Sequence, residues 1–181
     1  AANPIAWYSA GTGAAQASLS YSRSGLFDDT VGIADADNIE DYPGNNIYGW
    51  NIPPETLPSA TAKIRIVANG YESVSPAFTL KGLAITAPTL GQQVTHGTNF
   101  TVRWVSAGLA GNIDILYSAD NRASFPVTLN PTPLAIGAGS YVWAVDLSQT
   151  PPSTEAKLRI VVRDGADDVR RGIELMDRYF I

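Results

Sequence analysis

Alternating apolar and polar side chains recur along the chain and indicate β-strands. In the stretch AKLRIVV, Leu158 and Ile160 fall on one face of an extended strand and Lys157 falls on the other. The stretch AKIRIV, at 62–67, repeats this alternation. Turns such as ANG, RDG and PGNN separate the strands. The pattern predicts antiparallel sheets that each turn one face to a core and the other face to water.

The strand patterns occur twice in the same order, about 93 to 97 residues apart. Four blocks match: WYSAG with WVSAG, LSYSRSG with ILYSADN, YGWNIP with YVWAVD, and AKIRIV with AKLRIV. The four tryptophans form two matched pairs, Trp7 with Trp104 and Trp50 with Trp143. We interpret these rings as core residues. Stacking of sugar rings on an exposed tryptophan remains the alternative.

The repeat predicts an all-β fold of two tandem antiparallel β-sandwiches, residues 1–81 and 82–175, followed by a tail at 176–181. The second copy of the tryptophan block is preceded by LAITAPTLGQQVTHGTNF, which has the pattern of an opening strand and turn. The first copy has almost nothing before it. The first unit therefore lacks its own first strand in this sequence, and the tail RYFI aligns with the place where a third unit would begin.

The order of these blocks resembles a known family. A Trp followed by Gly, a strand ending in YS, the motif Y-x-W-x-[IV], AKIRI and a closing SVSPAFTL are similar to the repeat of the Ser/Thr-rich, lipid-anchored fungal cell-wall glucan-synthesis family. Similar repeats occur in bacterial and archaeal surface proteins. The resemblance covers almost the whole chain twice and implies immunoglobulin-like (fibronectin III-like) sandwiches at an extracellular location, with no catalytic residue. The second unit departs from the pattern where VRRGIEL replaces VSPAFTL.

Two explanations fit the missing strand. The chain is a piece of a longer tandem array, or it is a complete subunit whose tail completes the first unit of the next copy. Strand addition satisfies the backbone groups of an open sheet edge, and alternate side chains give the fit. A third interpretation is that residues 1–6 themselves cover part of the gap. The second explanation assigns residues to both partners: the donors are Arg178, Tyr179, Phe180 and Ile181, and the acceptor edge includes Ile5 and Trp7.

Composition narrows the class of partner. The formal charge is −5, and only Arg170 and Arg171 stand next to each other as a basic pair, which argues against nucleic acid. No apolar run reaches the roughly 18 residues that span a bilayer. The absence of cysteine excludes disulfides and thiol chemistry. The small residues AANP at the start are typical of a chain after signal-peptidase cleavage and favour an extracellular or cell-surface location.

Few residues suggest chemistry. His96 is the single histidine, and the sequence has no nucleophile elbow, zinc-protease motif or phosphate-binding loop, so we expect no enzyme. A lone loop histidine is expected in solvent. Asn99 begins the glycosylation triplet NFT, which also arises often by accident.

An acidic stretch in the first unit offers a possible cation site. Asp35, Asp37, Glu40 and Asp41 place oxygen ligands of the kind that calcium prefers in one loop. The spacing departs from the EF-hand pattern, and a solvated acidic loop is the alternative. We expect no other cofactor.

These observations favour a structural role. The leading hypothesis is a subunit of an extracellular filament or surface array that self-assembles head to tail by donor-strand complementation. The alternative is a glycan-binding, protein-binding or spacer module cut from a larger multi-repeat cell-surface protein.

Overall fold

The structure is a computed structural model that describes residues 3–10, 16–33, 39–68, 70–163 and 179–180. The described residues form antiparallel β-strands, with a 3-10 helix and no α-helix among them, so this part of the chain is all-β, as predicted. The chain divides into two compact units, Ala1–Leu80 and Lys81–Ile181. The division falls one residue before the expected one, and the tail is grouped with the second unit.

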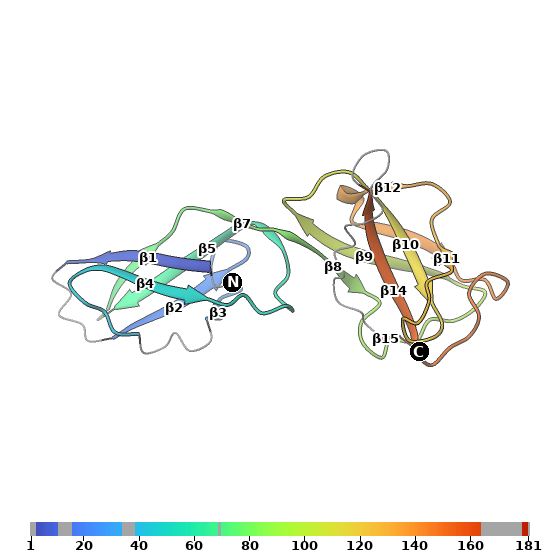
Figure 1. Ribbon diagram of the computed structural model, residues 1–181, viewed down its shortest axis with the longest axis horizontal. Coiled ribbons are helices and arrows are strands. Elements are labelled where there is room, and N and C mark those ends of the chain that lie inside the picture. The colour runs from blue at the N-terminus through green and yellow to red at the C-terminus, as the bar shows by residue number, and fades with distance from the viewer. Residues whose placement is uncertain (1–2, 11–15, 34–38, 69, 164–178, 181) are drawn as a thin grey trace. The chain divides into compact units, whose positions relative to one another are not determined.

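The first unit consists of two antiparallel sheets (Figure 1). Its strands are β1 (Asn3–Ser9), β2 (Ala17–Ser22), β3 (Val31–Gly32), β4 (Gly44–Trp50), β5 (Ser59–Ala68), β6 (Tyr71–Val74) and β7 (Phe78–Leu80). One sheet pairs β1 with β4 alone. The other has the order β3-β2-β5-β6, and β7 also pairs with β5.

The second unit has the same plan with one more strand in its smaller sheet. Its elements are β8 (Gly82–Ala87), β9 (Asn99–Ala107), β10 (Asn112–Ser118), β11 (Val127–Thr128), β12 (Leu134–Ala135), η1 (Ile136–Ala138), β13 (Ser140–Ala144), β14 (Ala156–Arg163) and β15 (Tyr179–Phe180). The smaller sheet has the order β13-β9-β8. The larger has the order β11-β10-β14-β15, and β12 pairs with β10.

Each unit has a core to which both of its sheets contribute, as in a β-sandwich. In the first unit, Leu19 of β2 and Trp50 of β4 belong to one buried cluster. In the second unit, Trp104 of β9 and Ile115 of β10 also belong to one buried cluster. Alternation along the strands therefore directs the apolar face of each sheet toward its partner sheet, where burial of a large apolar side chain contributes about 1.5–3 kcal/mol.

The matched sequence blocks occupy matching positions in the two units. Tyr21 lies 5.0 Å from Trp50 between ring centroids, with the planes inclined by 43°. Tyr117 and Trp143 repeat the contact at 5.9 Å and 48°. Cross-strand neighbours match as well: Ile5 lies opposite Tyr48, and Val102 lies opposite Tyr141.

Three of the four tryptophans are core residues, as we interpreted them. Trp50, Trp104 and Trp143 are 3%, 2% and 4% exposed, so their faces are closed to a sugar ring. Trp7 is half-buried at the edge of its core cluster.

The outer face of the larger sheets is less exposed to solvent than the alternation of apolar and polar residues predicts. Lys157 was expected in water, yet it is 2% exposed. Arg159 is half-buried, with its guanidinium carbon 4.0 Å from the ring centroid of Phe125. Arg65 lies over Phe27 at 4.9 Å in the first unit. In both units a phenylalanine from the loop after the matching strands β2 and β10 packs on the polar face, a contact that alternation alone does not reveal.

The tail also differs from the alignment that assigned it to the start of a further unit. β15 pairs antiparallel with Ala156 and Lys157 of β14. Phe180 lies opposite Ala156. In the first unit, Phe78 of β7 lies opposite Ala62, the residue that matches Ala156. β15 thus takes beside β14 the place that β7 takes beside β5, as a closing strand of its own unit.

Candidate functional site

One edge of β1 has no neighbouring strand among the residues that the structure describes. β1 pairs with β4 along its whole length on one side. The matching strand of the second unit, β9, pairs with β13 on one side and with β8 on the other. The described part of the first unit contains no counterpart of β8 (Figure 1). The free edge leaves backbone N–H and C=O groups available to an incoming strand.

The side chains next to this edge are incompletely covered. Ile5 and Trp7 are both half-buried and pack against the core of the first unit. Their counterparts in the second unit, Val102 and Trp104, are 0% and 2% exposed. Since the two units share the surrounding strand pattern, the difference marks apolar surface that a strand on this edge would bury.

A buried polar network holds the indole of Trp7. Its Nε1 donates a hydrogen bond of 2.9 Å to Oδ1 of Asp41, and the hydroxyl of Ser9 donates to the same oxygen. Asn46 donates to this oxygen through Nδ2 over 3.4 Å, and its Oδ1 accepts from the backbone N–H of Tyr42 over 3.0 Å. Asp41, Ser9 and Asn46 are 5%, 6% and 6% exposed. The network fixes the orientation of the ring at the edge.

The second unit anchors its matching ring differently. Nε1 of Trp104 donates over 2.7 Å to the backbone carbonyl of Ile136 in η1. In each unit the acceptor precedes the strand that pairs with the tryptophan strand, but only the first unit uses a carboxylate. The sequence motif predicted the two tryptophans but did not indicate which group accepts the hydrogen bond from each indole Nε1.

The outer face of the β1–β4 sheet is apolar and exposed. Tyr8 and Ile47 are 71% and 73% exposed. Ala6 lies opposite Ile47 and is also exposed. This face adjoins the free edge, so a strand added to β1 would extend it.

The proposed donor residues are only partly described. Tyr179 lies opposite Lys157 of β14, and Phe180 lies opposite Ala156. Arg178 and Ile181 lie outside the described residues. The structure therefore shows Tyr179 and Phe180 paired with β14 of their own unit.

The acidic stretch separates into residues with different roles. Asp35 and Asp37 lie outside the described residues. Glu40 is exposed and accepts a hydrogen bond from the hydroxyl of Tyr42, which raises the pKa of that tyrosine. Asp41 is committed to the network beneath Trp7. Among the described residues, no group of three or more His, Cys, Asp or Glu side chains is placed to hold a metal ion.

Asn99 is exposed at the first residue of β9 and lies opposite Ala144. Its glycosylation stays a prediction.

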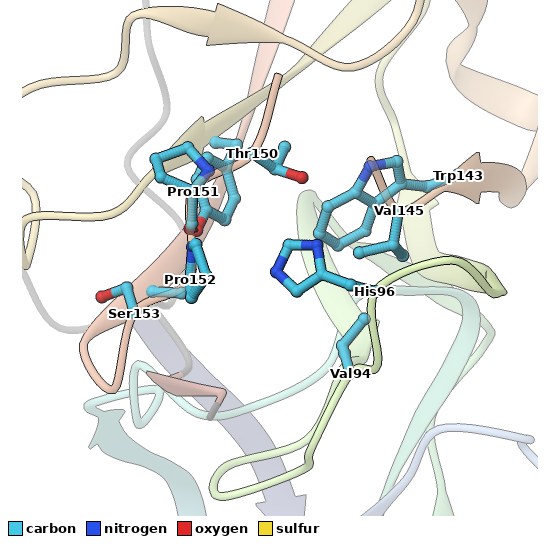
Figure 2. A pocket seen from close by; sticks show the side chains of 10 residues that line it. Val94, His96, Trp143, Val145, Thr150, Pro151, Pro152 and Ser153 are labelled. Carbon is cyan, nitrogen blue, oxygen red and sulfur yellow. The ribbon is translucent and has the colours of Figure 1, made fainter. Parts of the chain in front are cut away.

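His96 is not the freely solvated side chain that we expected. It is half-buried, and its Nδ1 is enclosed without a hydrogen-bond partner in the described structure. Figure 2 shows its ring in a small cavity of the second unit, facing Pro151 and Pro152 and near Trp143 and Val145. The cavity volume of about 30 Å³ is enough for water and far too small for an organic ligand.

The turn beside this cavity is held by Asp146. Its carboxylate accepts hydrogen bonds from the backbone N–H and the hydroxyl of Ser148, at 2.9 and 2.8 Å. These bonds, followed by the charge of His96, lower the pKa of Asp146. The arrangement stabilises a turn.

Comparisons with family models, with curated proteins and with solved structures give no match. In the described part of the chain, no helix has the length and apolar character that crossing a membrane requires.

Proposed function

We propose that the chain is a structural subunit of an extracellular filament or surface array. Its two units are immunoglobulin-like sandwiches, and the C-terminal tail of one copy pairs with β1 of the next. The observation that carries the proposal is the contrast between the free edge of β1 and the occupied edge of β9, together with the half-buried Ile5 and Trp7 beside the free edge.

Transfer of the tail from β14 of its own chain to β1 of another copy is favourable if the ladder of hydrogen bonds on β1 is longer than that on β14. On its own chain, the two described residues of the tail each pair with a residue of β14. On the matching edge of the second unit, β8 forms five residue pairs with β9. Each ladder hydrogen bond contributes about 0.5–1.5 kcal/mol net, and each large apolar side chain buried adds about 1.5–3 kcal/mol. A ladder on β1 as long as that of β8 on β9 would gain more pairs than the described pairs that the transfer breaks.

The geometry of such a contact leads to a polymer. The donor and acceptor surfaces are different parts of one chain, so the contact is heterologous and propagates unless its rotation closes a ring. The repeated packing motifs, which resemble those of surface proteins, favour an extracellular address.

A second candidate is a binding module of a larger surface protein. The exposed face formed by Tyr8, Ala6 and Ile47 favours it, because a contiguous apolar surface with an aromatic ring suits a glycan or a protein ligand. This function needs no self-association.

Deletion of residues 176–181 separates the two candidates. We expect the full chain to form regular fibres in electron micrographs and the deleted chain to sediment as single folded particles. Circular dichroism must show that the deletion leaves the β-structure intact, and Phe180→Asp in the full-length chain provides a second variant. Fibres from the folded deletion variant would show that the tail is not the connector. Isolated full-length particles at all concentrations would favour the binding module.

A further inference from the structure

We infer that the pairing of the tail with β14 is an autoinhibitory contact. In this closed form, β15 is paired with β14 of its own chain, the tail is withheld from β1 of other copies, and the subunit stays monomeric. In the donated form, the tail lies on β1 of the next copy. The inference rests on the proposed function, because it states what controls the transfer of the tail that the filament requires.

The two forms exclude each other because they use the same face of the tail. In the closed form, Phe180 lies opposite Ala156, a core residue that is 2% exposed. Directly opposed residues share a face of the sheet, so position 180 is on the core face of the second unit. Alignment of the tail with β8 places Phe180 opposite Trp7, beside the core of the first unit in the next copy. One position cannot lie over both cores at once.

The closed form leaves the second unit with a closing strand. β7 pairs with β5 at Ala62, and β15 pairs with β14 at the matching Ala156. Ala62 and Ala156 are 0% and 2% exposed, so both strands lie beside the core of their unit. β10 lies on the other edge of β14, so departure of β15 opens the edge of the sheet at Ala156 and Lys157. An open edge is unfavourable, and the second unit therefore resists release of the tail.

Subunit concentration decides between the two forms. Pairing within one chain costs none of the translational freedom that association between chains costs. The donated form bears that cost but can gain a longer ladder, since β8 forms five residue pairs on the matching edge. The closed form therefore prevails in dilute solution. The strength of the pairing between β15 and β14 then sets the concentration at which fibres begin to form.

A reversible disulfide tests whether the tail must leave β14. Lys157→Cys/Tyr179→Cys joins two directly opposed residues, which lie within disulfide reach, in a chain that has no cysteine of its own. After oxidation in dilute solution, this protein should remain as single particles in electron micrographs at concentrations where the unmodified chain forms fibres. Reductant should restore fibres in the same sample and should leave fibres of the unmodified chain unchanged.

A single substitution tests whether the natural pairing limits assembly. Lys157→Gly weakens the closed form, because glycine disfavours a strand and removes the side chain opposite Tyr179, and it changes no residue of the donor or of β1. The lowest concentration at which fibres sediment should fall roughly fivefold. Lys63→Gly is the matched control, since Lys63 lies opposite Ser22 in the first unit as Lys157 lies opposite Ser118 in the second. Its effect should stay below about twofold, because it does not touch the pairing of the tail.

Two results would overturn the inference. Fibres from the oxidised double variant would show that the tail need not leave β14. An unchanged fibre-forming concentration for Lys157→Gly, with circular dichroism showing intact β-structure, would show that the pairing does not limit assembly. In that second case the filament proposal stands if the oxidised double variant stays monomeric and its reduced form assembles. Absence of fibres from both the unmodified chain and the reduced double variant would instead reject the filament proposal, and the inference with it.

Discussion

Replacement of the matched tryptophans by alanine should destabilise the two units unequally. Trp104 is 2% exposed, so Trp104→Ala removes a fully packed ring and the hydrogen bond to Ile136. Large-to-small changes of this kind cost about 3–5 kcal/mol. Trp7 is half-buried, and Asp41 keeps its hydrogen bonds from Ser9 and Asn46 when the indole is lost. We expect Trp7→Ala to cost roughly half as much, about 1.5–2.5 kcal/mol.

Urea unfolding of single chains measures both costs. Because each unit has its own core, each should unfold in its own transition, which the variants themselves assign. Trp50→Ala and Trp143→Ala are the matched controls, since these rings are 3% and 4% exposed and should cost nearly the same in the two units. If Trp7→Ala costs as much as Trp104→Ala while the controls agree, β1 has no uncovered surface and the reasoning fails.

Three further predictions concern other sites. Hydrogen bonds from the Ser118 and Ser124 hydroxyls lower the pKa of Asp120 from 3.8 to about 2. The stability that the ionised Asp120 contributes is therefore complete above about pH 4 and is lost as the pH falls toward 2. In urea melts, Asp120→Asn should reduce this loss of stability between about pH 4 and pH 2, and an unchanged loss would contradict the assignment. Calcium should leave the melting midpoint of the first unit unchanged, because Asp41 already accepts hydrogen bonds from Trp7 and Ser9. A midpoint that rises with calcium concentration would mean that the acidic stretch binds the ion. His96→Phe removes an enclosed nitrogen that has no partner in the described structure, and the new ring fills part of the cavity. The unfolding free energy of the second unit should therefore rise by about 1 kcal/mol at neutral pH. A loss of stability would contradict this description of the cavity.

The sequence predicted the strands and the core rings because both depend on local periodicity. The alternation in 156–163 and the matched tryptophans are visible without a structure, and β14 and three buried rings follow them. The order of the blocks in the two repeats also predicted that β1 lacks a neighbour on one edge, and the described residues place no strand there.

Contacts between distant segments were not predictable from the same patterns. Lys157 is buried, and the guanidinium of Arg159 lies over the ring of Phe125, which comes from the loop after β10. Strand alternation does not encode contacts of this kind with distant loops. The acidic stretch suggested a cation site, and no pattern in it indicated that Asp41 accepts a hydrogen bond from the indole of Trp7. The cation site itself stays a prediction, because Asp35 and Asp37 lie outside the described residues. The pairing of β15 with β14 was not predicted either, because its described part involves two residues, too few to leave a sequence signal.

The most direct test of strand donation is a disulfide between copies. The chain has no cysteine, so two introduced cysteines report a single contact. Alignment of the tail with β8 pairs Tyr179 of one copy with Tyr8 of the next, and directly opposed residues lie within disulfide reach. Oxidation of Tyr8→Cys/Tyr179→Cys should give a ladder of covalent oligomers, whereas the control Lys157→Cys/Tyr179→Cys, which joins a pair seen within one chain, should give monomers. A Tyr8→Cys/Tyr179→Cys protein that stays monomeric under oxidation, while the control cross-links, would contradict the account.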